Sequence, residues 1–173
     1  LSMDAAERYY ESLGRPWERA AFIKARVMAG DQDAGQGFLG RLSPFVWRKH
    51  LDYATIDDAH DIRQRMRRAR KPVGGSLDGR NIKLDPGGIR EIEFFTQTQQ
   101  LIAGGRDESL RVRGTVDGLD RLAAAEWIDG ATADQLTDDY CAHRDIEHRL
   151  QMIADAQTHI LPKSEEGWSR LAA

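Results

Sequence analysis

Apolar residues recur every three or four positions along most of the chain, which is the spacing that α-helices require. In the N-terminal half this pattern predicts helices over residues 4–13, 16–29, 31–42 and 55–71. Ser2 is placed to cap the first helix, and Gly14 and Gly30 to end the first two. Pro44 is expected to separate the third helix from a new segment, because proline lacks the N–H that a helix interior uses.

The C-terminal half shows the same periodicity after a break. The stretch "PVGGSLDGR", residues 72–80, combines proline, a glycine pair and Asp-Gly, and is predicted to be a flexible connection. Beyond it we expect a short extended piece and then a helix that runs to residue 103 and ends at Gly104-Gly105. Further helices are predicted over 116–127, over 132–154, where Thr132 opens a capping box, and from Ser164 onward. Strand signals are nearly absent. The predicted fold class is all-α, a helical bundle divided into segments 1–71 and 81–173 by the connection.

Composition indicates a very soluble protein that can still bury an apolar core. Hydrophobic residues make up 40% of the 173 residues and charged residues 31%, and the formal net charge is −3. This balance gives no general reason to expect nucleic acid or a membrane as a partner. Cys141 is the one cysteine, which excludes a disulfide within the chain and favours a reducing, cytoplasmic location. We expect it to be a small core residue.

The N-terminal sequence "LSMDAAERYY" does not resemble a signal peptide, because no basic region precedes an apolar run. No apolar stretch approaches the roughly 18 residues that a membrane-spanning helix needs. Since a helix is predicted from the fourth residue onward, we expect the chain to be a fragment of a longer protein.

A Pro-Gly-Gly turn precedes the helix that ends at residue 103, and it is the first candidate site. The N-terminus of a helix offers free N–H groups, and glycine lets a ligand approach the backbone closely. Lys83, Gly87, Gly88 and Arg90 could therefore hold a phosphate. The alternative is that the two glycines only form a tight turn and allow close packing.

The helix after this turn carries a polar stripe. Arg90, Glu93, Gln97 and Gln100 are three or four residues apart and share one helical face, which is either solvated or the polar wall of a cleft. Glu91 and Glu93 are two residues apart and point about 200° away from each other, so they make a poor metal site. The sequence predicts no metal ligand set in this chain.

Two further polar patterns have simple structural explanations. The basic run at residues 63–70 could bind nucleic acid, but aspartates lie just upstream of it, and arginines late in a helix also complement the helix dipole. His143 and His148 are five residues apart, which does not form an i, i+4 metal site. Arg144 and Glu147 belong to a polar row that we interpret as a network within the bundle or as the wall of a cleft.

Longer motifs resemble a known family. The stretch "NIKLDPGGIREIEFFTQTQQLIAGGRDESLRVRGT", together with "ERYYESLGRPWERAAFIKARVMAGD", "FVWRKHLDYATIDDAHDIRQRM" and "HRDIEHRLQMIADAQTHILP", is similar to bacterial glutamine synthetase adenylyltransferase. The resemblance covers nearly the whole chain. The form "GGIREIEF" resembles the N-terminal, adenylyl-removing half of that bifunctional family, since the other half tends to carry aspartate where this chain has Glu91. Asp85 departs from the family, which often has glycine there.

The resemblance implies a reaction that this chain does not perform alone. In the family, phosphate removes AMP from a tyrosine of glutamine synthetase and releases ADP, while the other half adds AMP from ATP. The Mg²⁺-binding aspartates of the family lie in a Gly-Ser-x-x-Asp-x-Asp motif on a nucleotidyltransferase core, and this motif is absent here. Segment 1–71 would pack on that missing core. Glutamine synthetase and the PII signalling protein are the implied partners.

The same resemblance suggests which residues face the cleft. Lys83, Arg90 and the N–H groups of Gly87 and Gly88 are candidates for phosphate or nucleotide contact. The supporting residues would be Glu91, Glu93, Gln97, Trp17, Glu18, Lys24 and Arg26. A second hypothesis remains open, in which the chain is a non-catalytic regulatory domain that docks on glutamine synthetase or PII.

Overall fold

The computed structural model describes residues 2–49 and 76–173, and these residues form α-helices without a β-sheet. The helices are α1 (Met3–Leu13), α2 (Pro16–Ile23), α3 (Gln32–Val46), α5 (Ile89–Ala103), α6 (Thr115–Ala124), α7 (Gly130–Ala154) and α8 (Glu165–Ala172), with a 3₁₀ turn η1 at Glu108–Leu110. The predicted all-α class is confirmed. The helix predicted over 55–71, with its basic run, and the first part of the predicted connection lie outside the described residues.

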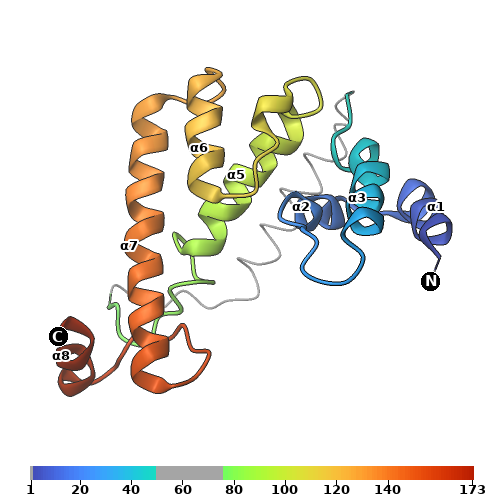
Figure 1. The fold of residues 1–173 in the computed structure, drawn as a ribbon. Helices are drawn as coiled ribbons and strands as arrows, with labels where there is room; N and C mark the ends of the chain where they lie inside the picture. The colour runs from blue at the N-terminus through green and yellow to red at the C-terminus, as the bar shows by residue number, and fades with distance from the viewer. Residues whose placement is uncertain (1, 50–75) are drawn as a thin grey trace.

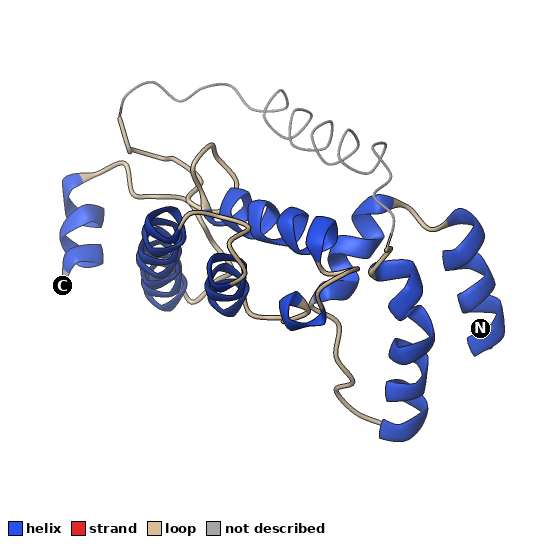
Figure 2. Ribbon diagram, turned by 90° about the horizontal axis from the view of Figure 1, so that it is seen from above, coloured by secondary structure: helices blue, strands red, loops and turns tan. Residues whose placement is uncertain are grey.

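The helices form two groups that meet through α2 and α5. Figure 1 shows α5, α6 and α7 side by side, with α1–α3 at one end of the molecule and α8 at the other. Seen from above, α6 and α7 are nearly end-on and α5 runs across them (Figure 2). The helix α6 packs against both α5 and α7, whereas α2 packs against α3 and α5. The contact between α2 and α5 therefore joins the two groups.

The second helix is shorter than predicted. It ends at Ile23 instead of residue 29, and the amide of Lys24 closes its last turn. The chain then leaves the helix so that Val27 can pack over Gly35 of α3, where an added Cβ would lie 2.6 Å from Val27 Cγ2. Packing against α3 therefore outweighs the helical pattern of residues 24–29.

Pro44 is predicted to end the third helix, but it does not interrupt it. The helix α3 continues through it to Val46. Pro44 and Gly40 are both exposed, so the Gly40 carbonyl that proline leaves without an N–H partner can still be hydrated. Phe45 and Val46 are buried and hold the last turn in the core.

Aromatic side chains fill the core of the N-terminal group. Ile23, Phe45 and Val46 form its buried cluster, and Tyr10 and Phe22 pack against it. The rings of Tyr10 and Phe22 meet edge to face with their centroids 4.9 Å apart. Close packing of large rings thus fixes α1 and α2 against the end of α3.

The C-terminal group has two apolar clusters along α5 and α6. One joins Ile92, Leu119 and Ala133 of α5, α6 and α7, and the other contains Leu110 of η1. Gln100, predicted to belong to the polar stripe of α5, is buried instead. Its Nε2 donates to the carbonyls of residues 110 and 112, each at 2.8 Å. This amide donates to one buried and one partly buried carbonyl, so its role is structural.

Two local predictions on α7 are wrong. The helix begins at Gly130, because the Asp129 side chain accepts a hydrogen bond from the Thr132 amide and acts as the cap. Thr132, predicted to be the cap, lies in the first turn. Cys141 is exposed and not a core residue. None of the described helices combines the length and the apolar character that crossing a membrane requires.

The last helix is tied to residues 76–81. Ser164 caps α8 as predicted, and Trp168 Nε1 donates to Asp78 Oδ1 at 2.9 Å. This hydrogen bond, with a second from Ser76, holds the pKa of the Asp78 carboxyl below its usual value. Asn81 forms an isolated antiparallel bridge with Ile160. The described end of the predicted connection is therefore hydrogen-bonded to the segment after α7.

Candidate functional site

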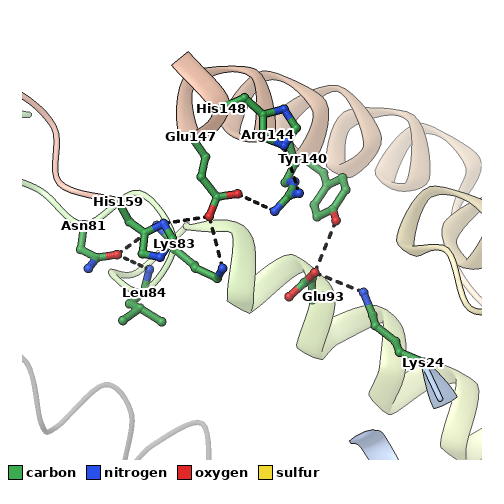
Figure 3. A network of polar contacts seen from close by, with 10 residues as sticks. All are labelled: Lys24, Asn81, Lys83, Leu84, Glu93, Tyr140, Arg144, Glu147, His148 and His159. Atoms are coloured by element: carbon green, nitrogen blue, oxygen red, sulfur yellow. Dashed lines mark hydrogen bonds and ion pairs between the residues drawn. The ribbon is translucent and has the colours of Figure 1, made fainter. Parts of the chain in front are cut away.

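Polar side chains gather between α5, α7 and the turn before α5. Figure 3 shows two carboxylates, Glu93 and Glu147, each contacted by polar side chains that come in part from other elements. The helix α7 contributes Tyr140, Arg144 and Glu147, whose spacings of four and three place them on one face. The row of Arg144 and Glu147 identified in the sequence is thus a network within the bundle.

Glu147 is the buried centre of this network, with 1% of its side chain exposed. Its Oε1 lies 3.2 Å from Lys83 Nζ and 2.8 Å from His159 Nδ1, and its Oε2 accepts from Arg144. The approach of His159 is close, but the imidazole N–H direction is not aligned for a hydrogen bond. Along the sequence, Lys83 lies before α5 and His159 lies in the loop after α7. Glu147 therefore connects both segments to this helix.

The surroundings of Glu147 make it a structural carboxylate. Both of its oxygens contact cationic groups, which compensates the cost of burying the charge. Lys83, predicted to contact phosphate, has its ammonium group on Glu147 instead.

Glu93 is the more accessible of the two carboxylates, with 24% of its side chain exposed. Its Oε1 lies 3.2 Å from Lys24 Nζ and 3.4 Å from the hydroxyl of Tyr140. Lys24 also donates to Thr115 Oγ1 at 3.0 Å, so one ammonium group links the segment after α2 with α5 and α6. This cluster lies where the two helix groups meet, and part of it is exposed.

The backbone amides of the Pro-Gly-Gly turn have partners within the chain. The amide of Gly87 donates to Glu91 Oε2 at 3.0 Å, and that of Gly88 to the Asp85 carbonyl at 2.9 Å. The next two amides donate to the carbonyls of Ile82 and Lys83. Gly87 has φ +82°, a left-handed conformation that favours glycine. This geometry favours the tight-turn interpretation over a phosphate loop.

We expect Gly88→Ala to lower the free energy of unfolding by about 3 kcal/mol, because the added Cβ collides with backbone that cannot turn away. It would lie 2.4 Å from the Ile82 carbonyl oxygen. Gly87→Ala is the matched control: its Cβ meets nothing within 4 Å, and only its positive φ costs about 1 kcal/mol. Urea unfolding followed by circular dichroism measures both, and equal effects would contradict this account of the turn.

Arg90 is the predicted phosphate contact that remains available. Its side chain is exposed, and its guanidinium group has no hydrogen bond or ion pair with any residue in the described ranges. Glu93 and Gln97 share its face of α5, and Gln97 is half-buried. The part of the predicted stripe that is not buried is therefore Arg90, Glu93 and Gln97, with Lys24 beside Glu93.

The predicted patch around α2 is only partly brought to this cluster. Lys24 reaches Glu93, but Trp17 is exposed on α2. Glu18 is buried and accepts a hydrogen bond from the Arg15 amide at 2.8 Å, as part of the capping box of α2. Arg26 lies on a separate pocket lined by α2 and α3. These residues do not form one surface.

Four members of the network were missed in the sequence. They are Tyr140, His159, Thr115 and Asn81, whose Oδ1 accepts from the amides of residues 83 and 84. Tyr140 lies one turn before Arg144 and could have been found from helical spacing. The other three lie in loops or at a helix start, where periodicity gives no signal.

The carboxylates described here do not fit a divalent metal. Across residues 2–49 and 76–173 there is no group of three histidine, cysteine, aspartate or glutamate side chains that could hold one. Glu93 and Glu147 face ammonium and guanidinium groups instead of each other. A cation would have to displace these partners.

Sequence comparisons identify the family. The model described as GlnD PII-uridylyltransferase matches residues 59–173, more than half of the chain, and that described as glutamate-ammonia ligase adenylyltransferase matches residues 1–41. Bifunctional glutamine synthetase adenylyltransferase/adenylyl-removing enzymes of Rhizobium meliloti and Bradyrhizobium diazoefficiens are 55% and 54% identical over 172 residues. The chain is covered to 99%, but it spans only 17% of the length of each relative. The chain therefore belongs to the family that the PII-uridylyltransferase model describes, and it corresponds to a segment of the bifunctional glutamine synthetase adenylyltransferases.

Proposed function

We propose that the chain is the helical part of the adenylyl-removing half of a bifunctional glutamine synthetase adenylyltransferase. The observation that carries this proposal is the identity of 54–55% across 99% of the chain with relatives whose names state both activities. The assignment to the removing half rests on the "GGIREIEF" form of residues 87–94, with Glu91 where the adding half is expected to carry aspartate.

The proposed reaction is phosphorolysis of an AMP–tyrosine bond on glutamine synthetase. Inorganic phosphate attacks the phosphorus, the tyrosine oxygen leaves, and ADP is released. Because the carboxylates of the described residues do not fit a divalent metal, we assign Mg²⁺ binding, and ATP binding in the adding reaction, to a nucleotidyltransferase core outside this chain. On this proposal the chain alone does not catalyse.

The chain would position a face toward that core. Glu147 holds Lys83, and with it the turn before α5, against α7. This contact fixes the start of α5, where exposed Arg90 and partly buried Glu93 lie on one face. Arg90 has uncommitted donors that suit a phosphate oxygen. Lys24 orients Glu93 from the N-terminal group.

We propose glutamine synthetase as the target and the PII protein as a regulator, both acting in the cytoplasm. The first follows from the names of the relatives, and the second from the family resemblance. The docking alternative gives the chain the same partners but no role in the chemical step. The two hypotheses therefore differ in the expected rate of AMP removal by variants of this chain, and not in which partners it binds.

A segment exchange tests this function. We expect the Rhizobium meliloti enzyme to keep both activities when its matching segment is replaced by this chain, because the two are 55% identical. Phosphate-dependent release of ADP from adenylylated glutamine synthetase measures removal, and incorporation of labelled AMP measures addition. A folded hybrid that removes AMP normally but no longer adds it would contradict the assignment to the removing half.

A further inference from the structure

A pocket opens between the N-terminal group and the loop after η1. Its volume is about 430 Å³, within the range of sites that hold small molecules in proteins. Its walls come from the end of α2, the middle of α3 and the loop before α6. The lining residues that carry the argument are Phe22, Arg26, Leu39, Trp47, Arg111 and Arg113.

Three of the lining side chains are arginines, and no described lining residue is acidic. Arg26 and Arg113 are exposed, and neither has a hydrogen bond or ion pair with any residue in the part of the chain that the structure describes. Two uncommitted guanidinium groups thus share one concave surface. Guanidinium groups bind carboxylates and phosphates through paired hydrogen bonds.

The third arginine is held in place. Arg111 Nε donates to the Gly104 carbonyl at 2.7 Å, and its Nη1 donates to Glu108 Oε1 at 2.9 Å. Its guanidinium carbon lies 5.7 Å from the centre of the Trp47 ring. These contacts fix the group while leaving some of its five donors free. A preorganised cation of this kind lowers the cost of binding an anion.

The rest of the wall is apolar. Phe22 and Leu39 are half-buried on α2 and α3, and Trp47 follows the end of α3. The pocket therefore offers an apolar surface next to a cluster of positive charge. A simple inorganic anion would contact only the charged part, whereas a ligand with an apolar body would use both.

We infer that this pocket binds a small organic anion that carries two negative charges, as a phosphate monoester or a dicarboxylate, together with an apolar body. The binding group is the set of Arg26, Arg111 and Arg113, and Trp47 and Phe22 contact the apolar body. This site uses none of the residues of the Glu93 and Glu147 clusters, and it does not depend on the proposed function.

Titration of the 173-residue chain with three probes tests the inference. Phenyl phosphate has the dianion and the apolar ring, succinate has two carboxylates, and butyrate has an apolar body with one charge. We expect phenyl phosphate or succinate to saturate at millimolar concentrations and to shift the NMR resonance of the Trp47 indole, with butyrate weaker. Tighter binding of phenyl phosphate would indicate that the ligand is a phosphate monoester, and tighter binding of succinate that it is a dicarboxylate.

Substitutions locate the binding group. Arg113→Gln and Arg26→Gln are each expected to weaken binding about tenfold, since each removes a charged hydrogen-bond donor. Arg121→Gln, an exposed position on α6, is the matched control and should leave binding unchanged. Both pocket positions are exposed, so these variants should fold, which thermal unfolding checks. Failure of both dianions to saturate, or unchanged binding in the Arg26→Gln/Arg113→Gln double variant, would overturn the inference.

Discussion

Glu147→Gln is expected to lower the free energy of unfolding by about 2–3 kcal/mol, because it leaves the Lys83 ammonium and the Arg144 guanidinium facing a neutral buried amide. If the cationic partners of Glu147 were fully buried, the expected loss of unfolding free energy would be larger. Lys83 and Arg144 are 26% and 35% exposed, however, so they can regain part of their hydration once the carboxylate charge is gone. Urea unfolding followed by circular dichroism measures the change.

An exposed ion pair provides the control. Glu166 pairs with Arg170 on α8, and 76% of its side chain is exposed. Glu166→Gln should change the free energy of unfolding by less than about 0.5 kcal/mol, as is typical of such pairs. We also expect faster amide hydrogen exchange at residues 81–84 and 158–161 in Glu147→Gln, since these segments lose their anchor on α7. Equal stability of both variants would contradict the central role of Glu147.

Several helix ends that a local residue sets could be predicted, although α7 is capped by Asp129 and not by Thr132. Ser2 and Ser164 cap α1 and α8 through their own hydroxyl groups, and Gly104 ends α5. The predicted end of α2 failed, because Val27 packs over Gly35, which lies in another helix. Local chemistry is visible in a sequence, whereas packing between distant segments is not.

The candidate site shows the same division. Arg144 and Glu147 could be paired from their spacing on one helix. Lys83 and His159 join them only through the fold. Lys83 lies 64 residues before Glu147, and His159 lies in the loop after α7. The Pro-Gly-Gly turn suggested free amides, but a sequence does not show that the carbonyls of residues 82, 83 and 85 accept them.

The proposed function makes a sharp prediction for Arg90 and Glu93 in the full-length enzyme that contains this segment. Arg90→Ala and Glu93→Gln are expected to slow AMP removal roughly 10- to 100-fold, the range for misplaced positioning groups. Addition of AMP should stay near the wild-type rate, because we assign that reaction to the other half. Arg121→Ala, an exposed position on α6, is the control for a general effect of arginine removal.

The most direct measurement is the rate of phosphate-dependent ADP release in a single turnover, with adenylylated glutamine synthetase at saturating concentration. Saturation removes differences in docking, so a slower rate reports the chemical step or its positioning. We predict that Arg90→Ala and Glu93→Gln are slow in this measurement while circular dichroism shows an intact fold. Wild-type single-turnover rates in both variants would contradict the account and favour a docking role for this segment.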